Sequence, residues 1–242
     1  MLALGRARRV PDPSTLPKFA SRLAGGVLDR AIAVAARPLC GTRTVIAVDS
    51  TGFTQSNASR HYVKRLTQLG SVEQVVRDFA KVTLAVDVDS KAVLACDVVT
   101  SHAADVKRLV PVLALVKDSG IPVWALLADK GYDSEQAHRD AREILGGGLV
   151  TQIPVRRCEP KLARQACRNY PHGCWRYRQQ RDFDPQLYAL RSAVECVNSM
   201  LKRKMGDTVH GRSLAAQARE IKCTVIAHNI RRLIDSGLLV IG

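Results

Sequence analysis

Two aspartates of this sequence stand directly after apolar segments, where carboxylates can serve phosphoryl transfer. Asp49 follows the run Val45 to Val48, and Asp129 follows the run Trp124 to Ala128. Considered alone, each aspartate is better explained as a residue that caps the turn after it. Together at the edge of a buried sheet, two carboxylates repel each other and need a compensating cation. Oxygen ligands suit Mg²⁺ or Mn²⁺, and a pair of such ions can hold the attacking and leaving oxygens in line.

A polar stripe on a predicted helix adds a third carboxylate. At about 100° per residue, Tyr188, Arg191, Glu195 and Lys202 share one narrow stripe of a helix expected near residues 186 to 204. The opposite side of that helix is aliphatic and consists of Leu190, Val194, Val197 and Leu201. We expect the aliphatic side to pack on a sheet, so that Glu195 is presented between two cations and a phenol. A solvated surface with an Arg191–Glu195 pair fits the same stripe.

These residues resemble the helix signature of the DDE transposases of bacterial and archaeal insertion sequences. That signature is tyrosine, two residues, arginine, three residues, glutamate, six residues, lysine, and all four positions and all three gaps match here. The segments AVDSTGF around Asp49 and ADKGYDS around Asp129 are similar to the corresponding family segments, in the right order, as is the closing IKCTVIAHNIRRL. The resemblance covers roughly residues 40 to 235.

The resemblance implies a ribonuclease H-like α/β fold and a two-metal reaction. Asp49, Asp129 and Glu195 would be the catalytic and metal-binding residues for Mg²⁺, with Mn²⁺ able to substitute. The metal ions would activate first a water and then the freed 3′-hydroxyl as nucleophiles on DNA phosphates, without a covalent protein intermediate. Family members commonly carry more sequence ahead of the first catalytic strand, so we expect a shortened or partial transposase.

Further residues are expected to bind DNA or to support the site. They are Tyr188, Arg191, Lys202, Lys130, Arg176 and Arg178. By the resemblance, Arg191 and Lys202 contact phosphates or DNA ends, and Tyr188 positions a base or phosphate near the cleaved end.

A basic insert with little periodicity spans residues 156 to 184. Its arginines and lysine are interleaved with Tyr170, Trp175 and Tyr177, a mixture suited to phosphate contacts and base stacking. The alternative is a solvated basic loop.

The same insert holds three cysteines and a histidine that could suggest zinc: Cys158, Cys167, Cys174 and His172. Their gaps lack the close Cys-x-x-Cys pairs of structural zinc modules, so we favour reduced, unrelated cysteines.

The elements that must position these residues follow from periodicity and turn signals. The segments TVIAVD, KVTLAVDV, AVLACDVV, VWALLAD and LVTQIPV predict strands, of which the second and third form a hairpin. Two helices separate the later strands. The first is closed by Gly120, and its Pro111 either kinks it or marks a restart; the second is capped by Asp133 with Gln136 as its N3 partner. Hairpin-linked strands are antiparallel and strand-helix-strand units are parallel, so we expect a mixed sheet with flanking helices.

The ends of the chain are predicted to be helical. One helix is expected from Ser14 or Thr15 to Ala36, interrupted by Gly25 and Gly26, and a last helix at residues 214 to 236. We divide the chain into a helical leader, residues 1–40, and a ribonuclease H-like catalytic domain, residues 41–242, which contains the basic insert.

Composition indicates a globular protein with a polyanionic partner. The chain has 242 residues, 46% of them hydrophobic, and a formal net charge of +15. A charge of this sign and size favours nucleic acid, although basic proteins also arise from genomic composition. We expect double-stranded DNA, at the element ends and the target, as the partner, bound by a homodimer or larger assembly.

Neither a membrane segment nor a secretory leader is indicated. No apolar run is long enough to span a bilayer, and the start breaks into Arg and Pro before a signal-like core develops. The seven cysteines are odd in number and scattered, which suits reduced thiols. We therefore expect a cytoplasmic, nucleoid-associated protein without membrane contact.

The function expected from the sequence is cleavage and strand transfer at insertion-sequence ends by a DDE transposase. One alternative is a related metal-dependent nuclease that cuts without joining. Another is a non-catalytic DNA-binding remnant of a transposase, which the high positive charge also fits. A tyrosine recombinase using Tyr188 is disfavoured, because that covalent chemistry does not need the three carboxylates.

Overall fold

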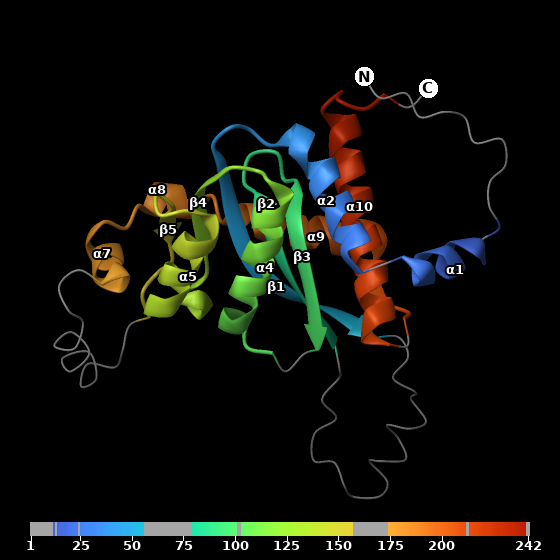
Figure 1. The fold of residues 1–242 in the computed structure, drawn as a ribbon, viewed down its shortest axis with the longest axis horizontal. Helices are drawn as coiled ribbons and strands as arrows, with labels where there is room; N and C mark the ends of the chain where they lie inside the picture. Colours follow the sequence, from blue (N-terminus) through green and yellow to red (C-terminus); the bar gives the residue numbers. More distant parts are fainter. Residues whose placement is uncertain are drawn as a thin grey trace, which may run out of the picture.

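Strands from both halves of the chain form one mixed sheet (Figure 1). The computed structural model describes residues 12, 14–23, 25–55, 79–100, 103–156, 174–211 and 213–240. The strand order is β3-β2-β1-β4-β5, and β6 pairs with β1 off this path. The bounds are β1 Thr44–Gln55, β2 Phe79–Asp87, β3 Val93–Thr100, β4 Val123–Ala128, β5 Val150–Gln152 and β6 Thr208–Val209.

The pairing confirms the expected mixture of antiparallel and parallel strands. β1, β2 and β3 are antiparallel neighbours, whereas β4 and β6 run parallel to β1 and β5 runs parallel to β4. β2 and β3 form the expected hairpin, which turns between Asp87 and Val93. Asp87 accepts a hydrogen bond from the Ser90 backbone N–H at 2.9 Å, and Lys91 takes a left-handed conformation with φ of 63°. The predicted α/β fold class is confirmed.

Helices cover both faces of the sheet (Figure 1). Their bounds are α1 Thr15–Arg22, α2 Gly25–Ala36, α4 Asp105–Ser119, α5 Glu135–Leu145, α7 Trp175–Arg181, α8 Pro185–Ala189, α9 Ser192–Met205 and α10 Leu214–Asp235. Two short 3-10 turns are η1 Arg37–Leu39 and η2 Lys130–Tyr132. None of the helices in these described ranges is long and apolar enough to cross a membrane.

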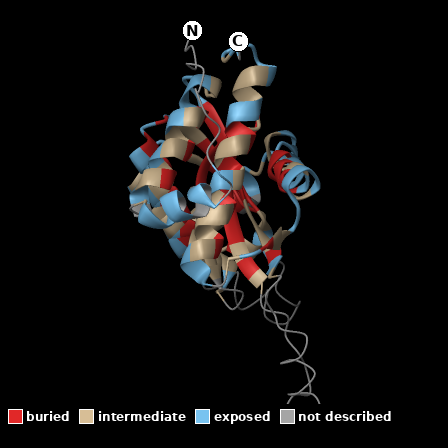
Figure 2. Ribbon diagram, turned by 90° about the vertical axis from the view of Figure 1, so that its right-hand side faces the viewer, coloured by how far each residue is buried: buried red, intermediate tan, exposed pale blue. Residues whose placement is uncertain are grey.

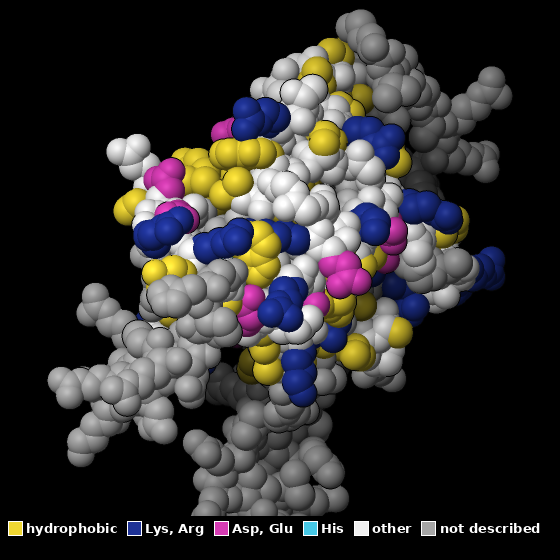
Figure 3. All heavy atoms as spheres, turned by 60° about the vertical axis from the view of Figure 1, so that its left-hand side comes forward, with side chains coloured by type: hydrophobic (Ala, Val, Ile, Leu, Met, Phe, Trp, Pro, Cys, Tyr) yellow, Lys and Arg dark blue, Asp and Glu magenta, His cyan; other side chains and the backbone are white. Residues whose placement is uncertain are grey.

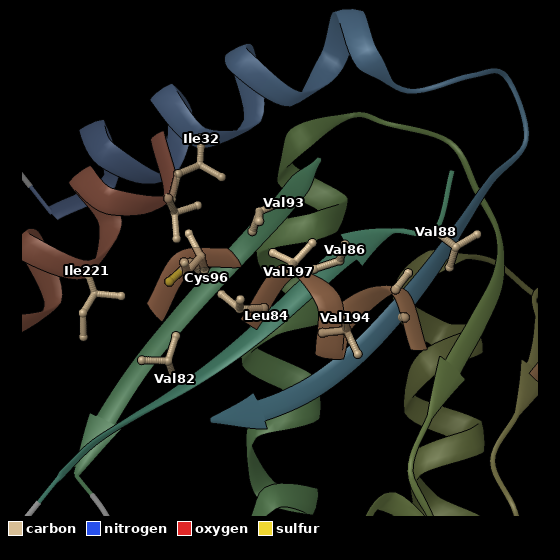
Figure 4. Close-up of a cluster of buried hydrophobic side chains, with 14 of the residues drawn as sticks. Ile32, Val82, Leu84, Val86, Val88, Val93, Cys96, Val194, Val197 and Ile221 are labelled. Carbon is tan, nitrogen blue, oxygen red and sulfur yellow. The ribbon is translucent and has the colours of Figure 1, made fainter. Parts of the chain in front are cut away.

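The core consists of two apolar layers, one on each face of the sheet (Figure 2). On one face, Ile32 of α2, Val194 and Val197 of α9 and Ile221 of α10 pack with strand residues such as Leu84 (Figure 4). On the other face, α4 and α5 pack with the alternate residues of the same strands. Successive strand residues point to opposite faces, which is why one apolar run serves both layers.

The expected interruption of the first helix lies just before the glycine pair, which itself begins the second helix. α1 ends at Arg22 and α2 begins at Gly25. α2 packs against α10 and β3 and contributes Ile32 to the core, so this part of the leader is joined to the sheet. α4 runs continuously through Pro111 and ends at Gly120, which has a φ of 66°.

The helix expected at residues 186 to 204 is two helices. Between α8 and α9, Leu190, Arg191 and Ala193 each donate a backbone hydrogen bond to the residue three positions earlier. This tighter winding rotates the preceding turn relative to α9. Leu190, expected on the apolar side, is therefore exposed, whereas Val194 is buried as expected.

The expected cap of α5 is also wrong by one residue. Ser134 is the N-cap and accepts a hydrogen bond from the Ala137 N–H at 3.0 Å. Asp133 instead pairs with Arg176, because a carboxylate that receives a guanidinium fork gains charge-assisted bonds that a backbone cap does not offer. The short strand β6 was not predicted; two residues are too few for a periodic signal.

Candidate active site

The register of the sheet brings Asp49 and Asp129 to the same level. Val48 and Ala128 are partners in the parallel pairing of β1 with β4. The residues that follow them, Asp49 and Asp129, therefore lie at the same level of the sheet. β4 ends there, whereas β1 continues to Gln55 beside β2 and meets β6 only at Thr54. Within the described residues, β1 thus has no strand partner on this side between Val48 and Thr54.

The alternation of side chains places both aspartates on the face covered by α9. Ala47 and Leu127 belong to the apolar layer that includes α9. Asp49 lies two residues after Ala47, and Asp129 two residues after Leu127, so each aspartate is directed to the same face. Glu195 lies in the first turn of α9, with its side chain 55% exposed. The two strands and the helix therefore bring three carboxylates to one region.

The charges of Asp129 and Glu195 both act on the pKa of Asp49. Burial raises the pKa of the Asp49 carboxyl, the backbone N–H of Ser50 and the charge of Arg191 lower it, and the charges of Asp129 and Glu195 raise it again. Asp129 is held in place by a 2.7 Å hydrogen bond from the Lys130 backbone N–H to its Oδ1. A cation between the three acids would offset both the burial of Asp49 and the repulsion.

Arg191 fills part of that role in this structure. Its guanidinium donates from Nη2 to Oε1 of Glu195, which is the pair that the helical spacing also allows. The same guanidinium lies 5.8 Å from the centroid of the Tyr188 ring, which in turn lies 5.2 Å from the ring of Phe183. Tyr188 and Arg191 are thus held together, although they belong to separate helical segments.

Lys202 lies further along α9, toward the unpaired stretch of β1. Its Nζ is 5.7 Å from the centroid of the Phe53 ring. Phe53 is itself buried in the layer beneath α9. The helix therefore carries Lys202 to the same side of β1 as Asp49.

The donor set fits a divalent cation in chemistry but not in its present arrangement. Across the described ranges, no three His, Cys, Asp or Glu side chains are grouped to hold a metal ion. Glu195 is engaged by Arg191. Asp49, Asp129 and Glu195 offer oxygen ligands only, the kind that Mg²⁺ prefers.

The three other expected DNA contacts have different surroundings. Lys130 is exposed at the start of η2. Arg176 donates from Nε at 2.8 Å and from Nη2 at 2.5 Å to the two oxygens of Asp133, whose side chain is fully buried. The Arg178 guanidinium lies 4.7 Å from the centroid of the Trp175 ring.

The aromatic and cysteine residues of the insert fall partly outside the described residues. Tyr170, Cys158, Cys167 and His172 lie there. Cys174 is the N-cap of α7, and its Sγ accepts from the Tyr177 backbone N–H at 3.4 Å. Cys174 and the other described cysteines, Cys40, Cys96, Cys196 and Cys223, are free thiols.

Two groups of hydrogen bonds that sequence reasoning missed brace the turn after Asp129. The Tyr132 hydroxyl lies 2.9 Å from Ser50 Oγ, which lies 2.9 Å from Thr83 Oγ1. Tyr132 is 1% exposed, and Ser50 directly follows Asp49. The hydroxyls thus tie the two aspartate-bearing segments together; their positions beside the aspartates were the available signal.

The second group ties α7 to the same turn. Glu135 accepts from the backbone N–H groups of Trp175 and Arg176 at 3.1 Å each. The Arg156 backbone N–H donates to Asp133 Oδ2 at 2.8 Å, and its Nε donates to the Lys130 carbonyl at 3.0 Å. Arg156 at the start of the insert and the first turn of α7 within it therefore both bind the segment that follows Asp129.

Comparison with known proteins gives one match. The family model described as "Transposase DDE domain" matches residues 41–230. No curated protein and no solved structure matches the chain.

Proposed function

This chain belongs to the family of transposase DDE domains, and from that premise we propose that it cuts and joins DNA strands at the ends of an insertion sequence by metal-dependent phosphoryl transfer. The observation that carries the proposal is the register of β1 with β4, which sets Asp49 and Asp129 side by side on the face covered by α9. Glu195 lies on that helix, and its charge raises the pKa of Asp49.

We propose Asp49, Asp129 and Glu195 as the residues that hold divalent ions. Two Mg²⁺ ions bound there would polarise the attacking and leaving oxygens of a DNA phosphate. The protein contributes the placement of the ligands. Burial makes Asp49 a poorly solvated carboxylate, which gains from a cation. The Lys130 N–H fixes Asp129, and Tyr132 anchors the turn that carries it.

Arg191 has a separate part in the proposal. It holds the Glu195 carboxylate while no cation is bound, and a metal ion would replace it as the partner of that carboxylate. The released guanidinium would then be available to a DNA phosphate, since a planar fork of donors matches phosphate oxygens. Tyr188 and Lys202, on either side along the chain, are proposed to contact the same DNA end.

Cleavage assays with matched variants test the proposal. The substrate is a linear duplex carrying the DNA that flanks the gene for this chain, incubated with Mg²⁺ or Mn²⁺. We expect Glu195→Gln to reduce cutting by more than about 100-fold, because even residues that only orient metal ligands cost about 10- to 100-fold. Strand transfer into a supercoiled plasmid distinguishes joining from cutting alone.

Glu143→Gln provides the control, since Glu143 is an exposed glutamate of α5 and undergoes the same chemical change. Calorimetric titration with Mn²⁺ gives a second readout, in which only Glu195→Gln should weaken binding. Equal cutting by the wild type and Glu195→Gln would refute the assignment. Cutting without joined products would favour the nuclease alternative.

A further inference from the structure

A second basic site lies at the outer edge of the sheet, away from the three carboxylates. A pocket of about 350 Å³ opens between the end of α5, the edge strand β5 and α7. Its lining includes Arg142, Trp175, Arg178 and the backbone of Gly147 and Gly148. Neither glycine has an atom within 4 Å of where a Cβ would stand, so the backbone is open to a ligand here.

Arg142 is held firmly at this pocket by neutral partners. Its Nη1 donates to the His138 carbonyl at 2.9 Å, and its Nη2 donates to Thr151 Oγ1 at 3.1 Å. The guanidinium carbon lies 3.5 Å from the centroid of the Trp175 ring. One guanidinium is therefore pre-positioned, and the ring that the sequence suggested for base stacking is covered by it on one side.

Arg178 brings a second positive charge to the same ring. Burial lowers the pKa of Arg142, the nearby charge of Arg178 lowers it further, and the charge of Glu135 raises it in part. Among the described residues, neither arginine has a carboxylate partner in an ion pair. Asp182, which also lines the pocket, is paired with Arg181 at 2.8 Å, and this hydrogen bond lowers the pKa of Asp182, as does the charge of Arg178 to a lesser extent. Glu135 accepts from the backbone of α7. Two cations thus share a pocket in which the nearby carboxylates are hydrogen-bonded to other groups.

We propose that the pocket between Arg142 and Arg178 binds a phosphodiester group of DNA, at a position separate from the strand that is cut. The inference rests on the proposed function, which supplies DNA as the ligand. Paired guanidiniums offer parallel N–H donors that match phosphate oxygens, and they gain charge-assisted bonds that neutral acceptors do not provide.

The position of the pocket favours a DNA strand over a small free anion. α7 joins it to the active site, because Glu135, close after the Asp129 turn, binds the backbone N–H groups of Trp175 and Arg176. Figure 3 shows several Lys and Arg side chains, with some Asp and Glu side chains among them, on the side of the molecule where Figure 1 places α5 and α7. Basic side chains beyond the pocket favour a polyanion over a single small anion.

Salt-dependent DNA binding tests this site. The probe is a fluorescein-labelled duplex of the DNA flanking the gene. Its binding is measured by fluorescence anisotropy in Ca²⁺ buffer at about 50 to 300 mM NaCl. In a plot of log affinity against log salt concentration, each phosphate contact adds about one unit to the slope. We expect Arg178→Gln to weaken binding and to reduce the slope by about 1. Arg142→Lys keeps the charge but loses the fork, so it should weaken binding with a nearly unchanged slope.

Arg30→Gln is the matched control, because Arg30 is an exposed residue of α2 and its loss removes the same charge. Equal effects of Arg178→Gln and Arg30→Gln on DNA binding would mean that only the net charge matters, and this would overturn the proposed site. If cutting depends on Glu195 while Arg178→Gln binds DNA like the wild type, this inference falls and the proposed function stands. If the wild type neither binds nor cuts the duplex, both fall.

Inorganic phosphate distinguishes a free-anion site. In thermal unfolding at constant ionic strength, phosphate should not stabilise the wild type more than Arg178→Gln. Selective stabilisation of the wild type by phosphate, together with an unchanged DNA slope in Arg178→Gln, would show a small-anion site and overturn the DNA assignment.

Discussion

Arg191 and Glu195 form an exposed pair whose separation should affect metal binding more than folding. Because the Glu195 side chain is 55% exposed, the pair contributes about 0.5 kcal/mol or less to stability. We expect Arg191→Gln to leave the urea midpoint almost unchanged and the Mn²⁺ affinity equal or higher, since a competing cation is removed. Cutting should nevertheless fall, because a proposed phosphate contact is lost. A large drop in Mn²⁺ affinity would contradict the idea that arginine and metal compete for Glu195.

His138 gives the fold a defined pH dependence. Its side chain is fully buried, its Nδ1 lies 2.8 Å from Thr151 Oγ1, and its Nε2 has no partner among the described residues. Burial, with a further contribution from the charge of Arg142, lowers the pKa of His138 from 6.5 to about 4.

The sign of the effect follows from proton uptake by the unfolded chain. Between pH 6.5 and about 4 the unfolded state binds a proton at His138 that the folded state does not, so stability falls as the pH falls through this window. The loss should approach about 3 kcal/mol. Urea unfolding at pH 7.5 and pH 4.5 measures it. His138→Gln should show a smaller difference between the two pH values than the wild type, and an equal difference would contradict the assignment.

At the level of single residues, the sequence indicates candidate site residues better than it predicts the contacts that their side chains make. The choice of Asp49, Asp129 and Glu195 rests on apolar runs that end in acids and on the helix signature, and it stays a prediction. The strand register shows that Asp49 and Asp129 follow paired residues at one level of the sheet. The partner of Arg176 could not be predicted, because Asp133 lies 43 positions away in the chain and the pairing depends on how α7 returns to the sheet. Arg142 was missed because nothing in its helical surroundings distinguishes it from a solvated arginine.

Among the elements, α7 depends on charge more than on apolar packing. Arg176 is 15% exposed and Asp133 is fully buried, so removal of the arginine leaves an uncompensated buried carboxylate. We expect Arg176→Gln to destabilise the protein by about 3 kcal/mol or more. Urea unfolding provides the measurement. Arg181→Gln, on the exposed side of the same helix, should leave the midpoint unchanged; equal effects of the two variants would show that the buried pair has no special weight.

The helices near the signature show where periodicity stops being informative. The apolar spacing correctly predicts that Val194, Val197 and Leu201 are buried. It misses the change to tighter winding before α9. Backbone hydrogen bonds to the third or to the fourth preceding residue place side chains in similar positions over a single turn, so the apolar spacing does not distinguish them. The sequence alone therefore predicts which helix packs on the sheet, and the structure is needed to locate its first turn.

For the whole molecule, Asn229 joins three segments that are distant in sequence. It is fully buried in α10, its Oδ1 accepts from the Val93 N–H at 2.9 Å, and its Nδ2 donates to the carbonyls of Val93 at 2.8 Å and Ile32 at 3.3 Å. β3 is an edge strand, so this amide satisfies backbone groups that no further strand binds.

Replacement of that amide tests its contribution. Asn229→Leu should destabilise the protein by about 2 to 4 kcal/mol, because it leaves buried donors and acceptors at the start of β3 without hydrogen-bond partners. The comparison is Asn198→Leu on α9, where the amide oxygen is buried without a hydrogen-bond partner in the described structure. Thermal or urea unfolding should show a clearly smaller loss there. Equal losses would mean that side-chain volume, not the hydrogen bonds, determines the effect.

The hydrogen bonds that meet at Asp133 bear on how such a domain can change. Arg156 donates to this carboxylate through its backbone N–H, which every residue except proline can offer, whereas Arg176 donates through its side chain. Selection can therefore replace Arg156 at less cost to this carboxylate than Arg176. We expect position 156 to vary more than position 176 in lineages that keep the geometry around Asp129.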